Sequence, residues 1–251
     1  MSRGFFTNSV FPILLALLVS TSALSAPGRK RHAPAGGRRA VVVDERLSAL
    51  RDEPRLEAHL VQRLGRGRMV SIIGARRAPD GINFYHVAVT RRTRGWLQAE
   101  SVVSPARTGD DARLLRLIKA SEGFELIARA RIFLDLFPRS PLRPAVLLLY
   151  SDTAEEAADK LSRDAARRFD EREMTPGDAP TYSYYLNYNG LDRFNRQGVG
   201  FIYDRRAKQF HYDGAGWREI VRRYPHTPEA EQARAKLNSL SAIVANQGSS
   251  Y

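Results

Sequence analysis

The chain has 251 residues, a formal net charge of +13 and 43 % hydrophobic residues. This length and hydrophobic content are enough for two modest domains with packed cores, and they exclude a chain that is disordered throughout. It contains no cysteine, which excludes disulfides, a lipid-modified cysteine, a thiol nucleophile and cysteine metal sites. The excess of positive charge points to anionic partners.

Residues 1–25 have the pattern of a secretory signal peptide. Arg3 is the only charged residue before an apolar run, Val10–Val19, which leads into the small residues of Thr21–Ala26. We place the cleavage before Ala26. The alternative is an uncleaved anchor, although the run is short for a membrane span. The prediction is an exported protein, periplasmic or secreted, without a transmembrane segment after cleavage.

Residues 26–39 are predicted to be a basic, flexible linker. They combine proline and glycine with five cationic side chains and have nothing apolar enough to bury. Such an arm fits anionic wall polymer, lipid headgroups or nucleic acid, and export makes nucleic acid the weakest of these partners. The alternative is a leader that keeps the mature N-terminus soluble and binds nothing.

Residues 40–104 alternate short apolar runs with turn residues, which predicts a compact β-barrel. The runs are Val41–Val43, Leu47–Arg51, Val61–Gly67, Val70–Gly74, Phe84–Val89 and Gly95–Leu97. In order and spacing they resemble the bacterial SH3-like (SH3b) family, through Leu-x-x-Leu-Arg, Leu-x-x-Gly, aromatic-x-x-Val and a closing Gly-Trp-Leu. The resemblance implies a non-catalytic binding module. It departs at Asp52-Glu53-Pro54, where many members have Ser-Gly-Pro, so the loop beside the ligand groove is expected to differ.

A candidate ligand site lies in the same segment. Its residues are Phe84, Tyr85, Arg91, Arg92, Arg94 and Trp96. The three arginines are expected at a hairpin tip, where they fit an acidic peptide or a glycan-linked carboxylate. The aromatic residues are candidates for an exposed groove, although neighbouring strand residues point to opposite faces, so at most one of Phe84 and Tyr85 faces out. Trp96 fits a core position equally well.

After Ser104-Pro105 the apolar pattern becomes helical, which places a domain boundary within residues 104–110 and a helical domain at 110–245. Asp110-Asp111 is predicted to cap the first helix, since acidic residues complement a helix N-terminus. A second helix follows Gly123 and ends at Pro138. Ser140-Pro141 is a helix start signal, with a capping hydroxyl and proline at the first helical position.

The pair Asp152 and Glu155 has the spacing of a capping box. It predicts that a new helix starts near Thr153. The stripe that follows contains alanines at helical spacing, which allow a neighbouring helix to approach closely.

One motif occurs twice, 87 residues apart. Phe137-Pro138-Arg139-Ser140-Pro141 and Tyr224-Pro225-His226-Thr227-Pro228 each end one helix on an aromatic residue and start the next with a hydroxyl and proline. This is a helix-turn-helix unit seen twice, and it resembles the tetratricopeptide-like repeats of bacterial envelope proteins. The resemblance implies a protein partner. The separation exceeds the repeat period of about 34 residues, so any array is short and interrupted.

Residues 181–214 interrupt the helical pattern with nine aromatic residues interleaved with cations. Phe201–Asp204 and Gln209–Asp213 are predicted to pair as a β-hairpin, and Tyr182–Leu191 is alternatively a helix. Aromatic residues among cations bind sugars, bases or extended peptides, but the plainer interpretation is core packing beside a solvated face. Residues 246–251 are predicted to be a disordered tail.

The usual hydrolase and nucleotide-binding motifs do not occur, and the five histidines are scattered singly. We therefore expect no enzyme activity, no cofactor and no metal. The predicted fold class is multi-domain α+β: a small SH3-like barrel, then tetratricopeptide-like helices with a hairpin insertion. The predicted function is an exported, non-catalytic binding or scaffold protein of the bacterial cell envelope, whose barrel contacts wall peptide or another peptide ligand and whose helices contact a protein partner. The alternative is a wall-acting enzyme, or a subunit of one, with an unrecognised active site.

Overall fold

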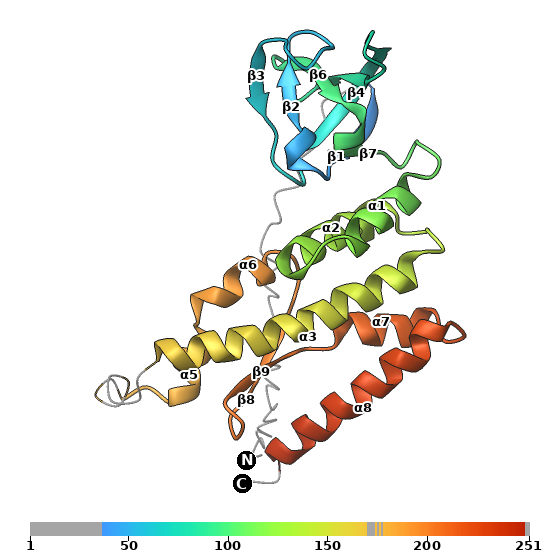
Figure 1. Cartoon of the computed structure of the whole chain (residues 1–251). Helices are drawn as coiled ribbons and strands as arrows, with labels where there is room; N and C mark the ends of the chain where they lie inside the picture. The colour runs from blue at the N-terminus through green and yellow to red at the C-terminus, as the bar shows by residue number, and fades with distance from the viewer. Residues whose placement is uncertain (1–36, 170–173, 175, 177, 249–251) are drawn as a thin grey trace, which may run out of the picture. The chain divides into compact units, whose positions relative to one another are not determined.

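The structure is a computed structural model that describes residues 37–169, 174, 176 and 178–248. The predicted signal peptide, residues 26–36 of the predicted linker and residues 249–251 of the predicted tail lie outside the described residues. The architecture is α+β, with an antiparallel sheet followed by a helical region that contains a β-hairpin (Figure 1).

Seven strands form one antiparallel sheet in the order β3-β2-β6-β5-β4-β1-β7. The strands are β1 (Arg38–Val42), β2 (Ala49–Arg51), β3 (Leu60–Arg63), β4 (Met69–Arg77), β5 (Asn83–Ala88), β6 (Arg94–Gln98) and β7 (Val102–Val103), with 3-10 turns η1 (Glu45–Leu47) and η2 (Ala99–Ser101). The first strand therefore takes up the last two residues of the predicted linker.

The sheet is open, whereas the sequence predicted a closed barrel. Within the described residues β3 pairs only with β2, and β7 pairs only with β1, so no ladder joins the two edges. β7 has two residues, and three of the four side chains of β3 are exposed instead of packed across a barrel. The predicted strands are present and pair antiparallel, but the predicted closure is absent from the described residues.

Apolar side chains from several strands form the core of the sheet. Val42, Val87 and Leu97 come from β1, β5 and β6, and each has 0 % exposed surface. Gly95 lets β2 and β6 approach closely, because a Cβ atom there would lie 2.6 Å from the carbonyl oxygen of Arg51. The glycine of the Gly-Trp-Leu element is thus required by packing.

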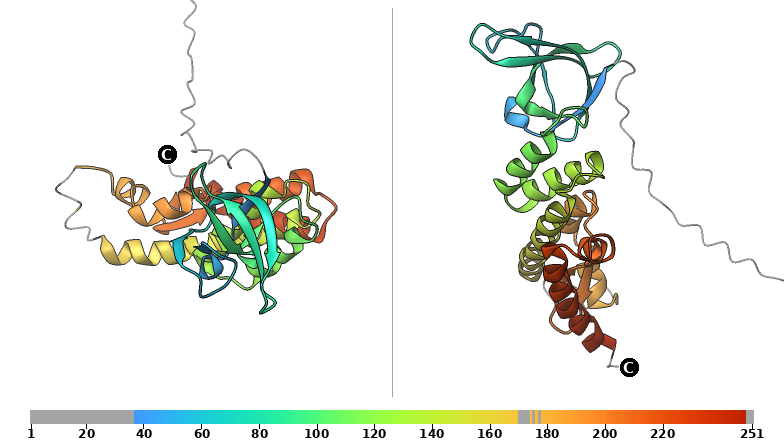
Figure 2. Two further views of the ribbon diagram at one scale, coloured as in Figure 1. Left: turned by 90° about the horizontal axis from the view of Figure 1, so that it is seen from above. Right: turned by 90° about the vertical axis from the view of Figure 1, so that its right-hand side faces the viewer.

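The helices pack in sequence, each against the next. They are α1 (Asp110–Lys119), α2 (Gly123–Leu136), α3 (Arg143–Arg168), α7 (Ala215–Arg223) and α8 (Pro228–Gly248). α1 contacts α2, α2 contacts α3, α3 contacts α7, and α7 contacts α8 (Figures 1 and 2). The repeated aromatic-proline motif joins α2 to α3 and α7 to α8, as the sequence predicted. α8 extends into the first three residues of the predicted tail.

The prediction of a new helix near Thr153 is wrong. α3 runs from Arg143 to Arg168 without a break. The polar side chains of the supposed capping box make tertiary contacts instead: Asp152 accepts a hydrogen bond from Trp217 Nε1 at 3.0 Å, and Glu155 binds residues of a later strand. Capping residues look the same in sequence whether their partners are local or distant.

The predicted helix start at Ser140-Pro141 is also displaced. α3 begins at Arg143, and no side chain caps it. The hydroxyl of Ser140 donates to Asp111 Oδ2 at 2.7 Å and accepts from the Leu142 N–H at 3.2 Å. Ser140 therefore stabilises the turn that leads into the helix and ties that turn to α1.

The predicted β-hairpin is present. β8 (Phe201–Asp204) pairs with β9 (Gln209–Tyr212), after the short helices α5 (Thr181–Leu186), η4 (Asn189–Leu191) and α6 (Asp192–Asn195). The alternative of a helix within Tyr182–Leu191 also holds in part. Most of the aromatic residues here are core: Tyr185, Tyr188, Tyr203, Phe210 and Tyr212 have 9 % or less of their surface exposed.

Polar side chains of α3 complete the outer edge of this hairpin. The backbone N–H of Phe210 donates to Ser162 Oγ at 2.7 Å, and that of Tyr212 donates to Glu155 Oε2 at 2.7 Å. His211 Nδ1 lies 2.9 Å from Glu155 Oε1. An exposed strand edge is thereby closed by a helix, which protects it from pairing with another chain.

The sheet and the helices share a hydrophobic core. Val41, Val43 and Val103 are 4 % exposed or less and belong to the same buried cluster as Leu114 and Ile118 of α1. Burial of apolar surface across this junction fixes the sheet against α1 and α2. The segment between β7 and α1 is therefore anchored at both ends, because β7 and α1 both contribute side chains to this core.

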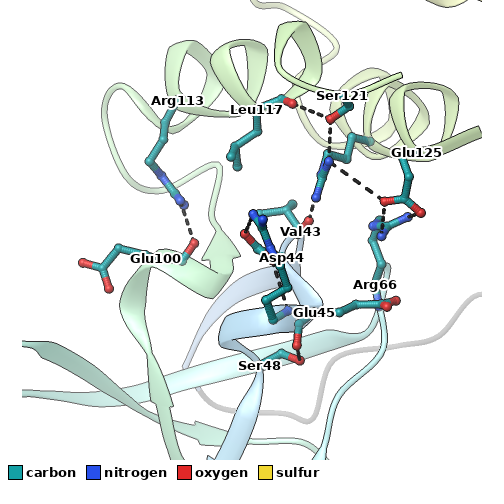
Figure 3. A network of polar contacts seen from close by, with 12 residues as sticks. Val43, Asp44, Glu45, Ser48, Arg66, Glu100, Arg113, Leu117, Ser121 and Glu125 are labelled. Carbon is teal, nitrogen blue, oxygen red and sulfur yellow. Dashed lines mark hydrogen bonds and ion pairs between the residues drawn. The ribbon is translucent and has the colours of Figure 1, made fainter. Parts of the chain in front are cut away.

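Polar contacts surround this shared core (Figure 3). Arg66 forms an ion pair with Glu125 at 2.5 Å, and Arg129 Nε donates to the Val43 carbonyl at 3.2 Å. Arg129 is 9 % exposed, and burial lowers the pKa of its guanidinium. Because these bonds link β1 and the loop before β4 to α2, they fix the orientation of the sheet as well as its position.

Candidate functional site

Tyr85 of β5 lies at the centre of the candidate site. Its ring packs against the core of the sheet and is partly exposed, because it lies at the rim of that core. The side chain of Arg107, from the segment between β7 and α1, donates from Nη1 to the Tyr85 hydroxyl at 3.2 Å. Two hollows, one on each side of this contact, include both residues in their walls.

The first hollow has a volume of about 320 Å³ and lies between the sheet and the start of α1. Its base is apolar, formed by Ile72 and Val102, and its rim is polar. The rim residues are Arg38, Ser104, Arg107, Thr108 and Asp110.

The second hollow has a volume of about 240 Å³ and follows the β4–β5 hairpin away from the helices. Arg76 and Arg77 end β4 and stand opposite Phe84 and Asn83 in the register of the sheet. We call the two hollows together, with the Tyr85–Arg107 contact between them, the Tyr85 groove.

The segment that carries Arg107 is held in one conformation. Ser104 Oγ donates to the Arg39 carbonyl at 2.6 Å, and the Arg107 N–H donates to the Ser104 carbonyl at 3.1 Å. The Ser104 N–H donates to Asp110 Oδ2 at 2.8 Å. The predicted cap at Asp110 is therefore corrected: Gly109 occupies the N-cap position, and the carboxylate of Asp110 turns back to this loop.

The groove is strongly cationic. Arg38, Arg76 and Arg77 are exposed and have no carboxylate within ion-pair distance in the part of the chain that the structure describes. Asp110 is the one carboxylate in the two linings, and it is 3 % exposed and bound to Arg113 at 3.3 Å and to Ser104. Its charge is directed into the protein, so the groove presents guanidinium groups to solvent.

Guanidinium groups around an aromatic side chain suit a carboxylate-bearing ligand. Arginine offers paired N–H donors that match the two oxygens of a carboxylate. The partly exposed ring of Tyr85 and the apolar base of the first hollow can pack against the carbon atoms between the charged groups of such a ligand.

The structure divides the sequence-predicted ligand residues among several places. Tyr85 lines the groove, and Phe84 is 1 % exposed, which agrees with the expectation that at most one of them faces out. Trp96 stacks on His86 with ring centroids 4.9 Å apart. Because His86 is adjacent to Tyr85 in the strand, this pair lies on the other face of the sheet.

Arg91 and Arg92 lie in the turn after β5, and Arg94 begins β6; all three are exposed. This turn is at the opposite end of β5 from the groove. The structure thus brings none of the three predicted arginines next to Tyr85.

Sequence reasoning missed the cations that do line the groove. Two of them, Arg76 and Arg77, are adjacent in the sequence and directly precede a turn, so a pair of cations at a strand end could have been noticed. Arg38 was assigned to the flexible linker. Nothing in the sequence distinguishes Arg107, because its role depends on the fold of the Ser104–Asp110 segment against the sheet.

A second cluster of ionisable groups, Glu155 with His211, has a different character. Both Glu155 oxygens are bound by residues of β9, and the hydrogen bond from the His211 ring to Glu155 raises the pKa of His211 above its ordinary value. The pair holds the hairpin to α3. Among the described residues, no group of three or more His, Asp or Glu side chains is placed to bind a metal ion.

No protein-family model, no curated protein and no solved structure matches this chain. No helix in the described ranges is both long enough and apolar enough to cross a membrane.

Proposed function

We propose that the protein is an exported, non-catalytic binding protein of the bacterial cell envelope, and that the Tyr85 groove binds an acidic peptide of the cell wall. The observation that carries the proposal is the set of four arginines that line the two hollows, at a junction whose segments are held by hydrogen bonds and a shared core. A site on a rigid support binds with less loss of conformational entropy than a mobile one.

Two features of the sequence support this proposal. The strand motifs of residues 40–104 resemble those of SH3-like domains, and that resemblance implies a module that binds peptides. The first 25 residues have the pattern of a signal peptide. We assign the wall peptide to the sheet and a protein partner to the helices, whose aromatic-proline joints resemble those of tetratricopeptide-like repeats.

The test is co-sedimentation of the protein with purified cell-wall sacculi at about 50 and about 500 mM salt, a range over which exposed charges become screened. The groove variant is Arg38→Gln/Arg77→Gln/Arg107→Gln, because the register places Arg77 on the same face of the sheet as Tyr85. The matched control is Arg91→Gln/Arg92→Gln/Arg94→Gln, which removes the same charge from the turn at the other end of β5. All six side chains are exposed, so both variants should keep the fold.

We expect the wild-type protein and the turn variant to sediment at about 50 mM salt and less at about 500 mM, because the groove arginines are exposed, and the groove variant to remain in solution at both. Equal loss of binding in both variants would show that general charge attraction is responsible and would refute the groove. Soluble wall fragments released during the incubation would instead support the enzyme alternative.

A further inference from the structure

The two hollows of the Tyr85 groove carry separate sets of cations. Arg38 lies in the first hollow, Arg76 and Arg77 lie in the second, and Arg107 belongs to both. The contact between Arg107 and the Tyr85 hydroxyl, at 3.2 Å, stands between them. Apart from the shared Arg107, an anion in one hollow therefore meets different arginines from an anion in the other.

The size of the hollows indicates that a ligand uses both. Pockets for small ligands usually measure about 300–1,000 Å³. The first hollow, at about 320 Å³, only reaches the lower end of that range, and the second, at about 240 Å³, falls below it. A ligand larger than the first hollow therefore extends over Tyr85 into the second.

Arg107 is placed to respond to anions on either side. Its Nε lies 3.7 Å from Asp110 Oδ1, and Asp110 is bound more closely by Arg113 and by Ser104. Asp110 is therefore satisfied without Arg107, whose half-exposed guanidinium keeps N–H donors for a ligand besides the one that it uses on Tyr85.

We propose that the groove recognises a peptide with two carboxylates, one in each hollow, whose intervening backbone crosses the Tyr85 ring. This inference rests on the proposed function and narrows its ligand to a class. Because each hollow has arginines that the other lacks, the two contributions to affinity should be separable.

The experiment titrates the full chain with synthetic probes by isothermal calorimetry at about 150 mM salt, where only close charges interact strongly. The probes are acetylated, amidated peptides with two glutamates separated by one, two or three alanines. In matched peptides glutamine replaces the first glutamate, the second or both.

We expect the best two-acid probe to bind about tenfold or more tightly than either one-acid probe, since a charge-assisted hydrogen bond contributes enough for such a factor. Arg38→Gln should remove the advantage conferred by one glutamate, and Arg76→Gln/Arg77→Gln the advantage conferred by the other. Arg91→Gln/Arg92→Gln should leave all affinities unchanged.

Equal affinity for one-acid and two-acid probes overturns the two-carboxylate inference while leaving a groove that binds acidic peptide. A two-acid preference that survives both groove substitutions also overturns it. If no probe binds, the inference fails, and sedimentation with sacculi decides separately whether the proposed function stands.

Discussion

The attachment of the β8–β9 hairpin to α3 depends on one carboxylate, and Glu155→Gln tests this. Glu155 accepts from the Tyr212 N–H at 2.7 Å and pairs with His211 Nδ1 at 2.9 Å. Glutamine keeps one oxygen, so one of the two bonds is lost. A hydrogen bond to a charged group contributes about 1.5–3 kcal/mol, so we expect a loss of about 2 kcal/mol, or about 4–8 °C in Tm for a protein of this size.

The pH dependence of that loss follows from His211. Its pKa is raised in the folded protein, first by the hydrogen bond to Glu155, so protonated His211 is favoured by folding. The resulting stability is fully present below the ordinary histidine pKa of about 6.5 and is lost as the pH rises through the folded value. The difference between wild type and Glu155→Gln should therefore be larger at pH 6 than at pH 9, where the bond to Tyr212 N–H remains.

The assay is urea unfolding, followed by circular dichroism, at pH values from about 5.5 to 9, a range in which glutamates are ordinarily ionised. Glu156→Gln is the matched control, because it removes the same charge from the next, exposed residue of α3. A difference between wild type and Glu155→Gln that stays constant or grows with pH would refute the role of His211. A loss equal to that of the control would refute the role of Glu155.

Two further substitutions test the packing. Trp217→Phe removes the N–H that binds Asp152, a carboxyl whose pKa is raised by burial. We expect the free energy of unfolding to fall by about 1–3 kcal/mol at pH 7, and by less near pH 4, where the carboxyl gains a proton. Equal losses at the two pH values would contradict this. Gly95→Ala places a Cβ atom 2.6 Å from the Arg51 carbonyl oxygen, and we expect it to destabilise the protein by about 1–3 kcal/mol, measured by thermal unfolding. The control is Gly65→Ala, where the nearest atom to the new Cβ is 3.8 Å away, and its destabilisation should be less than half as large.

Local patterns predicted the elements of the fold well. Alternation of apolar residues indicated the strands, and the motif around Phe137-Pro138 and Tyr224-Pro225 indicated where one helix ends and the next begins. These patterns report which residues are buried and where the backbone turns, and both are local properties of the chain.

Predictions that depended on the partner of a polar side chain were wrong. Asp152, Glu155 and Ser140 have the identities of capping residues, but their partners are Trp217 Nε1, β9 and Asp111. The prediction of a closed barrel was wrong for a related reason. Closure requires the two edge strands to pair with each other, and local sequence patterns do not specify how far apart the edges lie.

Of the residues that line the groove, only Tyr85 and Phe84 were predicted from the sequence. An aromatic residue in an amphipathic strand is visible in the sequence, but the cations around it come from β1, from the end of β4 and from the segment before α1. Those three segments meet because Val41, Val43 and Val103 share a core with α1. Arg91, Arg92 and Arg94 were chosen for their clustering in sequence, and the fold places them at the far end of β5.

The most direct test of the account is a hydrogen-exchange footprint of the full chain with and without purified soluble wall peptide. The account predicts protection at 75–77, 83–85 and 104–108, the segments that form the Tyr85 groove. Protection confined to the turn at 89–94, or no protection anywhere in the sheet, would contradict the proposal that the groove binds wall peptide.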